Sequence, residues 1–171
     1  MAQQLSHDGV LEKIASGYRL RFERHLRHPV EKVWTAISDP ERLPDWLAAA
    51  PALEPHAGGA IELRWQNTDL EGNHAVARGH ITEFEPPTII EYDTDIHGCI
   101  RWELEPQGNA CLLRLTVTHD LPEDYRAVVL AGWHVHIDFL EEALDGQAVD
   151  WPNWPMDRWE VHHERYAARI G

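Results

Sequence analysis

The residues most able to do chemistry lie close together near the end of the chain. The segment "GWHVHIDFLEEALDG" (132–146) is typical of a helix, and it places His134 and His136 on either side of one valine. Histidines can ligate metals, transfer protons or line a binding site. On a helix, however, residues two positions apart face in different directions, and a two-histidine metal clamp needs a spacing such as i, i+4. Neither this pair nor the adjacent His162 and His163 is therefore expected to bind a metal ion.

The predicted helix carries apolar side chains on two sides, which indicates that both sides are covered. At 100° per residue, His134 and His136 lie about 80° to either side of the centre of one apolar stripe, where the helix edge meets the rim of a core. Asp138 follows one turn after His134 and can orient its ring. The two stripes are Trp133, Ile137, Leu140, Leu144, Leu130 and Val129 on the core side, and Val128, Ala131, Val135 and Phe139 on the other.

The second stripe needs a cover, and the sequence offers two. The tail after Gly146 is rich in tryptophan, with Trp151, Trp154 and Trp159, and it continues into an expected helix through "EVHHERYAARI". We expect this tail to fold back over the outer face of the long helix. A homodimer interface is the alternative.

Arg24 is a second candidate, because it shares the apolar face of the strand "YRLRFERHL" with Tyr18 and Leu20. An arginine inside a cavity can hold a carboxylate or phenolate through two hydrogen bonds. The other interpretation, which we favour, is a structural salt bridge to one of the carboxylates Glu62, Glu91 or Asp93.

His119 closes "LTVTH" with the inward parity of its strand. It is a candidate acid–base group because histidine titrates near neutrality. A hydrogen bond that caps the loop before the long helix is the interpretation that we favour.

The remaining pattern predicts an α+β fold. Apolar and polar residues alternate over short runs separated by glycine, asparagine or proline, which is typical of an antiparallel sheet of six or seven strands. Two short helices are expected over 28–39 and 39–47, a loop over 48–59, and the long helix from Glu123 to Leu144. The expected strands are a hairpin over 10–26 and runs over 60–65, 75–85, 88–94, 99–105 and 110–119.

The two cysteines, Cys99 and Cys111, are expected to be free thiols. If "EPQGN" forms a hairpin turn in which Glu105 pairs with Ala110, the two sulfurs are about 16 Å apart along the strands. That separation is too large for a disulfide.

Composition limits the partners. The chain has 171 residues, enough for one domain, and its net charge is −14 with histidines neutral. Nucleic acid and anionic membrane surfaces would repel such a chain, so neither is expected as a partner. No apolar run approaches the roughly 20 residues that cross a bilayer, and the first residues lack a signal-peptide core, so a cytoplasmic location is expected.

Several segments resemble one family in their order and spacing. The runs "LRFERHLRHPVEKVWTAISDPERLPDW", "GHITEFEPPTIIEY", "IRWELEPQGNACLLRLTVTHDL" and "GWHVHIDFLEEALDG" are similar to the START-like, helix-grip (SRPBCC) superfamily, in the branch of homologues of the heat-shock-chaperone ATPase activator. The resemblance implies a curved sheet gripping a long C-terminal helix, with a cavity between them that takes an apolar ligand. The resemblance covers about residues 9–146. We expect one domain over 1–146, with 1–8 flexible, and a tryptophan-rich extension over 147–171 whose short helix packs on the same domain. This extension is similar to those of some bacterial members.

A curved sheet and a straight helix leave a space that aromatic side chains either fill or line. The sequence leaves these two outcomes open. No phosphate-binding loop, nucleophile elbow or dinucleotide fingerprint is present, and no cofactor is expected. The cavity candidates are Arg24, Trp46, Trp65, Tyr92, Trp102, His119, Trp133, His134, His136 and Ile137.

Three functions follow from this reading. The first is binding of a hydrophobic or aromatic metabolite without catalysis, which we favour. The second is an enzyme of the polyketide cyclase, dehydratase or hydrolase type that uses the same cavity. The third, implied by the resemblance, is a co-chaperone-like activator of a chaperone ATPase, with that chaperone as its partner.

Overall fold

A single curved antiparallel sheet forms one layer of the molecule in this computed structural model, which describes residues 7–68 and 71–170. Residues 1–6 of the segment expected to be flexible lie outside the described residues. The strands, in sheet order from one edge to the other, are β1 (Val10–Ile14), β2 (Gly17–Leu26), β8 (Ala110–His119), β7 (Gly98–Gln107), β6 (Ile89–Thr94), β5 (Val76–Glu85), β4 (Ala60–Trp65) and β3 (Ala48–Leu53).

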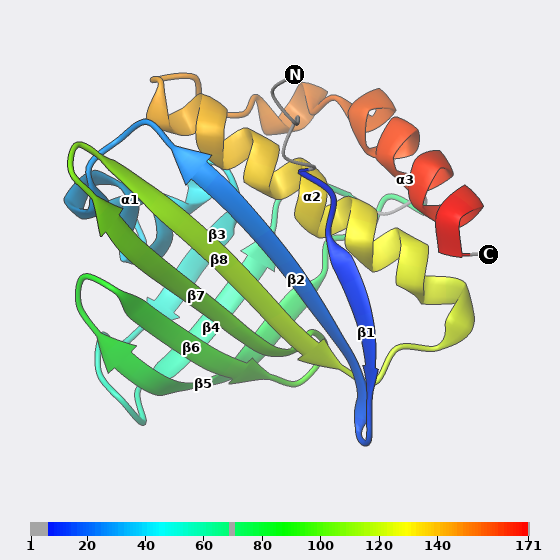
Figure 1. Ribbon diagram of the computed structural model, residues 1–171, viewed down its shortest axis with the longest axis horizontal. Helices are drawn as coiled ribbons and strands as arrows, with labels where there is room; N and C mark the ends of the chain where they lie inside the picture. The colour runs from blue at the N-terminus through cyan, green and yellow to red at the C-terminus, as the bar shows by residue number, and fades with distance from the viewer. Residues whose placement is uncertain (1–6, 69–70, 171) are drawn as a thin grey trace.

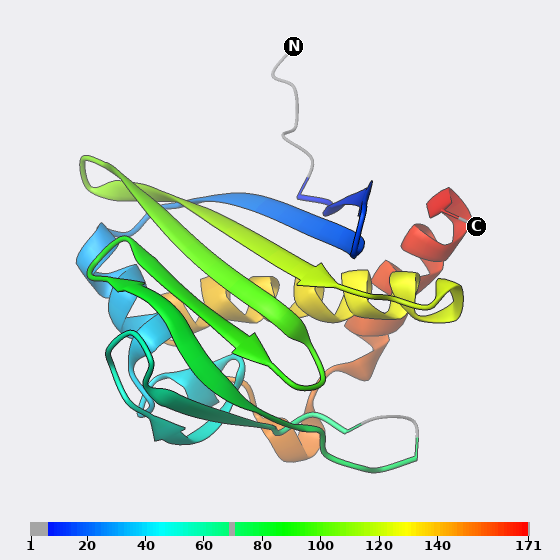
Figure 2. The ribbon, with the colours of Figure 1, turned by 90° about the horizontal axis from the view of Figure 1, so that it is seen from below.

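Three helices are present among the described residues. The long helix α2 runs along the inner face of the sheet, and α3 packs against α2 on the side away from the sheet (Figures 1 and 2). Within the described ranges, no helix is both long and apolar enough to cross a membrane. The helices are α1 (Val30–Ser38), α2 (Arg126–Leu144) and α3 (Met156–Ile170), with short 3₁₀ turns at Leu43–Asp45, Glu123–Tyr125 and Trp151–Asn153.

The sheet has eight described strands where six or seven were expected. The additional strand β3 lies in the segment 48–59, which the sequence analysis interpreted as a loop. Alanine and proline have low strand propensity, so the pattern carried no strand signal there. Pro51 is tolerated because β3 is an edge strand with an irregular register between Ala49 and Ala52.

The hairpin of β7 and β8 has a register two residues away from the expected one. Ala110 pairs with Gln107 rather than with Glu105. The connection consists of only Gly108 and Asn109, and Gly108 takes a φ of 63°, as tight two-residue hairpin turns require. The expectation about the cysteines is confirmed, since both are free thiols.

The space between the middle of the sheet and α2 is filled with side chains. Trp46 and Trp102 are fully buried there, with ring centroids 5.5 Å apart in an edge-to-face contact. Trp102 donates its indole N–H to the hydroxyl of Tyr92 at 2.9 Å, and Trp46 donates to the carbonyl of Ala36 at 2.8 Å. Their polar groups are therefore satisfied inside the core.

The tail lies on the outer face of α2. The stripe of Ala131, Val135 and Phe139 is buried within the single chain, so covering it does not require a second copy. The edge of Trp151 meets the Phe139 ring at 5.9 Å, and the guanidinium of Arg158 lies 5.1 Å above the Phe139 ring. Trp151 is itself fixed by its N–H, which donates to the carbonyl of Pro44 at 2.6 Å.

Candidate functional site

The two histidines of α2 lie in different environments. His134 faces α3, where its ring stacks on His162 with centroids 3.8 Å apart. Its Nδ1 lies 2.8 Å from the hydroxyl of Tyr166, which also accepts the backbone N–H of Gly9 at 2.7 Å. Burial lowers the pKa of His134 to about 3, against the opposing charge of Asp138. His134 is therefore neutral and held by protein groups.

Arg24 belongs to the same side of α2. Its side chain is buried, and Nη1 lies 2.9 Å from Asp138 Oδ1 and 3.1 Å from Glu141 Oε1. The favoured salt bridge is therefore present, but its predicted partners were wrong. Two of those carboxylates pair elsewhere, Glu62 with Arg64 and Arg78, and Glu91 with Arg101. Both contacts are made by Nη1, while Nε and Nη2 are buried without a partner among the described residues, and Arg24 is not among the residues that line the cavity described below.

Three side chains lie close enough together to be considered as a metal site: His134, Asp138 and His162. Arg165 Nη2 lies 2.7 Å from His162 Nδ1, and a guanidinium only donates, so this nitrogen accepts. The proton of His162 then sits on Nε2, which donates to Asp138 Oδ2 at 3.0 Å. Both ring nitrogens of His162 are thus engaged by protein groups, and the three side chains belong to one hydrogen-bonded network.

This network shifts the pKa of its central carboxyl. Burial raises the pKa of Asp138, but the hydrogen bond from His162 and the charge of Arg24 outweigh burial. The net result is a pKa below the ordinary aspartate value, so Asp138 is ionised at neutral pH. The network thus ties β2, α2 and α3 together through one carboxylate.

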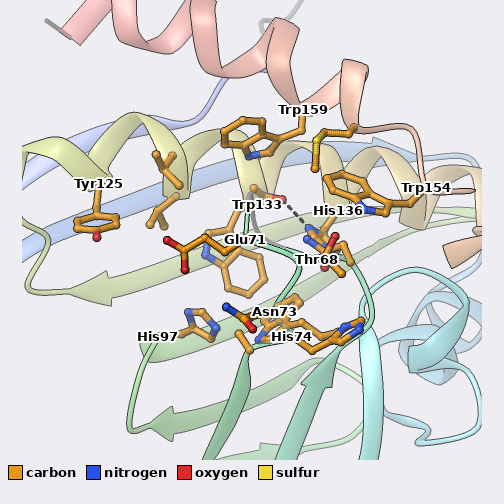
Figure 3. A pocket seen from close by; sticks show the side chains of 17 residues that line it. Thr68, Glu71, Asn73, His74, His97, Tyr125, Trp133, His136, Trp154 and Trp159 are labelled. Carbon is orange, nitrogen blue, oxygen red and sulfur yellow. Dashed lines mark hydrogen bonds between the residues drawn. The ribbon is translucent and has the colours of Figure 1, made fainter. Parts of the chain in front are cut away.

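The other side of α2 faces a cavity of about 600 Å³. It lies between the first half of α2, the end of β4 with the loop that follows, and the start of the tail (Figure 3). Trp154 and Trp159 of the tail form one wall, opposite His97, Asn73 and His74 (Figure 3). The apolar part of its lining comprises Trp65, Tyr125, Val128, Val129, Trp133, Trp154, Met156 and Trp159.

Four buried polar atoms of lining residues have no hydrogen-bond partner among the described residues. They are Trp65 Nε1, Asn67 Oδ1, His97 Nε2 and His136 Nε2. Buried polar groups are almost always paired, and each exception calls for an explanation. A cavity that collects four of them is suited to a ligand with polar groups of its own.

His136 presents a defined acceptor to this cavity. Its Nδ1 donates to the carbonyl of Gly132 at 2.6 Å, which leaves a lone pair on Nε2. Burial lowers its pKa to about 4, so the ring is neutral at physiological pH. The pKa of His97 is also about 4, again through burial. Both rings meet the edge or face of Trp65, at 5.2 Å and 5.1 Å between centroids.

Gly132 lies in the middle of α2 and lines the cavity. Glycine inside a helix costs about 1 kcal/mol relative to alanine. A Cβ added at Gly132 would meet no atom within 4 Å, so packing inside the protein does not demand a glycine. The residue leaves the helix backbone open to the cavity.

Comparison with known proteins identifies the family of the chain. The model of the activator of Hsp90 ATPase homolog 1-like proteins matches residues 27–145, more than half of the chain. The chain belongs to this family. The resemblance to the START-like superfamily is thereby confirmed, as is the α+β helix-grip fold.

Solved structures share the fold of this family member. CalU16 from Micromonospora echinospora is 23% identical, with a TM-score of 0.69 over 98% of this chain and 97% of that chain. A Bordetella parapertussis protein is 24% identical, with a TM-score of 0.69 over 99% and 90%. A Rhodobacter sphaeroides protein is 25% identical, with a TM-score of 0.64 over 81% and 99%. No curated protein matches the chain.

The candidates named from the sequence fall into three groups. Trp65, Trp133 and His136 line the cavity of this family member. Arg24 and His134 lie on the α3 side of α2. The others lie outside the cavity lining: Trp46, Tyr92, Trp102 and Ile137 fill the core, and His119 is half-buried at the end of β8, where burial lowers its pKa.

Part of the cavity lining was not predicted from the sequence. His97 lies in the turn between β6 and β7, and Asn67 follows β4, in segments that were interpreted only as turns. A glycine in a long amphipathic helix was a visible signal for Gly132. The tail was expected to cover α2, but nothing in its pattern assigned Trp154 or Trp159 to a cavity wall.

Proposed function

We propose that the protein binds a small, largely aromatic metabolite in the cavity between α2, the end of β4 and the tail, without transforming it. The observation that carries this proposal is a space of about 600 Å³ with aromatic walls and four buried polar atoms that have no partner in the described part of the chain. Small-molecule sites have volumes of about 300–1,000 Å³, apolar walls and a few polar groups. The open backbone at Gly132 supports the proposal further.

The same geometry speaks for binding over catalysis. A general base works best with a pKa near the operating pH, and those of His136 and His97 are about 4. The acid–base role considered for His119 has no support from the cavity, because His119 is not among the lining residues.

A thermal-shift screen with flavonoids, polyketide-like aromatics and fatty acids tests the proposal. A ligand at 100 times its Kd adds about 2.7 kcal/mol, which raises the Tm of a domain of this size by about 5–10 °C. The Gly132→Leu variant places a side chain in the cavity and is expected to abolish the shift. Ala168→Leu, on the exposed part of α3, is the control and should keep it.

Two results would contradict the proposal. One is a screen in which no compound raises the Tm of the wild-type protein. The other is a shift of the same size in Gly132→Leu, because binding would then take place elsewhere.

The family description favours a second candidate, engagement of a chaperone ATPase. A pull-down with purified bacterial chaperone homologue tests it, and a blank result would remove it. The cavity proposal is independent of that outcome.

A further inference from the structure

The donors and acceptors of the cavity restrict the chemistry of its ligand. We infer that the cavity selects an uncharged aromatic compound with a hydroxyl group, which donates to His136 Nε2 and accepts from Trp65 Nε1. This inference rests on the proposed function, because it specifies the ligand of the same cavity.

His136 supplies a fixed acceptor. Its Nδ1–H is held by the Gly132 carbonyl at 2.6 Å, so the ring cannot offer a proton from Nε2 while it stays neutral. Only 4% of His136 is exposed, and Nε2 has no partner among the described residues. A ligand group that meets this nitrogen must therefore donate.

Trp65 supplies a fixed donor beside it. An indole N–H donates and does not accept, and Trp65 is 8% exposed with its Nε1 partnerless among the described residues. The rings of Trp65 and His136 are 5.2 Å apart at an interplanar angle of 75°. An acceptor on one ring and a donor on the neighbouring ring match a hydroxyl group, which donates one hydrogen bond and accepts another. An ether or a carboxylate satisfies only the indole.

The charge of the lining argues against anions. Among the described residues of the cavity there is no lysine or arginine, and the one charged side chain is Glu71. The two buried histidines are neutral at physiological pH. A carboxylate ligand would lose its hydration without meeting a cation, which is unfavourable in a buried site.

Isothermal titration of the wild-type protein with matched bicyclic probes tests the inference. The probes are 2-naphthol, 2-methoxynaphthalene, naphthalene and 2-naphthoate. The methyl ether keeps the acceptor and the ring but loses the donor, so it is expected to bind about five- to tenfold more weakly than the naphthol. The naphthoate is expected to be the weakest of the four.

A variant assigns the preference to one side chain. His136→Phe keeps the aromatic packing against Trp65 and Trp151 and removes the acceptor. The ether-to-naphthol ratio of Kd values should fall to about one. His80→Phe, at an exposed position of β5, is the matched control and should keep the wild-type ratio.

The outcomes distinguish two claims: the preference for a ligand with a hydroxyl group, called here the hydroxyl rule, and the proposed binding of an aromatic ligand. Equal binding of the naphthol and its ether, or tightest binding of the naphthoate, would overturn the hydroxyl rule and leave aromatic-ligand binding intact. A wild-type ratio in a folded His136→Phe protein would also overturn it. If none of the probes binds and the wider screen is also blank, the proposed function itself fails. The wild-type series decides the hydroxyl rule even if the variant does not fold.

Discussion

His134 and His136 are separated by one residue on α2, yet they lie in opposite situations. The ring of His134 has a partner on each side, with Tyr166 at Nδ1 and His162 stacked on its face. His136 is just as buried and lines a cavity, but its Nε2 meets no described protein group. Similar burial and the same residue type therefore do not indicate the same role. The difference comes from what packs beyond the helix, a hydrogen-bonded network with α3 on one side and a cavity on the other.

Removal of the tail tests the network side and the cavity side of α2 at once, and it should lower stability more than any other change. Truncation after Gly146 removes Tyr166 and Trp151 from the outer face of α2 and takes Trp154 and Trp159 out of the cavity wall. Loss of the buried Tyr166 and of three half-buried tryptophans is expected to lower the free energy of unfolding by several kcal/mol. Urea denaturation measures this loss.

A shorter truncation is the control for the first. Ending the chain after Ala168 removes Arg169, whose exposed pair with Asp8 is worth at most about 1 kcal/mol. If both truncated proteins unfold at the wild-type midpoint, the tail does not stabilise α2.

Asp138→Asn probes the network side alone. It removes a charge partner of the buried Arg24, which keeps only Glu141. Breaking a buried pair typically destabilises by 3–5 kcal/mol, and we expect about 3 because Glu141 remains. Glu23→Gln, which breaks an exposed pair with Arg114, should change stability by less than about 1 kcal/mol. Equal effects of the two substitutions would mean that the network does not stabilise the fold.

The pH dependence of stability reflects histidines on both sides of α2, the network side and the cavity side. The pKa values of His134, His136 and His97 are lowered by burial to about 3, 4 and 4, from an ordinary value near 6.5. Between these values the unfolded chain binds more protons than the folded one, so stability is full above about pH 6.5 and falls as the pH drops toward 4. Asp138 loses its contribution only below its ordinary pKa of 3.8.

Removing one histidine should make that profile shallower. His136→Phe is expected to reduce the slope of the unfolding free energy by up to about 1.4 kcal/mol per pH unit in this window. Chemical denaturation at a series of pH values between 4 and 7 measures the slope. An unchanged slope would show that His136 is not held neutral in the folded state.

The smallest expected effect is a gain in stability on the cavity side. Gly132→Ala adds a Cβ that meets no atom within 4 Å and removes the flexibility of a helix glycine. Stability is expected to rise by about 0.5–1 kcal/mol, as measured by the denaturation midpoint. A loss of stability would mean that the Cβ is not accommodated and that the space beside Gly132 is narrower than described.

Local patterns in the sequence determined most of the fold. Alternation along "YRLRFERHL" and "ACLLRLTVTH" predicted strands that the structure contains, and the stripe from Leu130 to Leu144 predicted the long helix. The edge strand β3 was missed because its alanines and Pro51 carry no strand preference. The β7–β8 register was missed because it depends on which two residues make the turn.

The candidate site was less predictable, because it depends on contacts between distant segments. Arg24 pairs with Glu141, 117 residues later, and no periodicity links these positions. Trp65 and Trp102 both point inward from their strands, yet one lines the cavity and the other fills the core. That difference depends on how the tail and the loop after β4 pack against the rest of the fold. The residue pattern within a single strand does not predict this packing.

The cavity wall contributed by Trp154, Met156 and Trp159 belongs to a segment beyond the end of the family match at residue 145. Selection can therefore alter these three side chains while Trp151 and Tyr166 of the same tail keep their contacts with α2. Relatives with the same scaffold and a different C-terminal segment would offer a differently shaped chamber. Exchanging these segments between relatives is thus a direct way to transfer ligand preference from one protein to another.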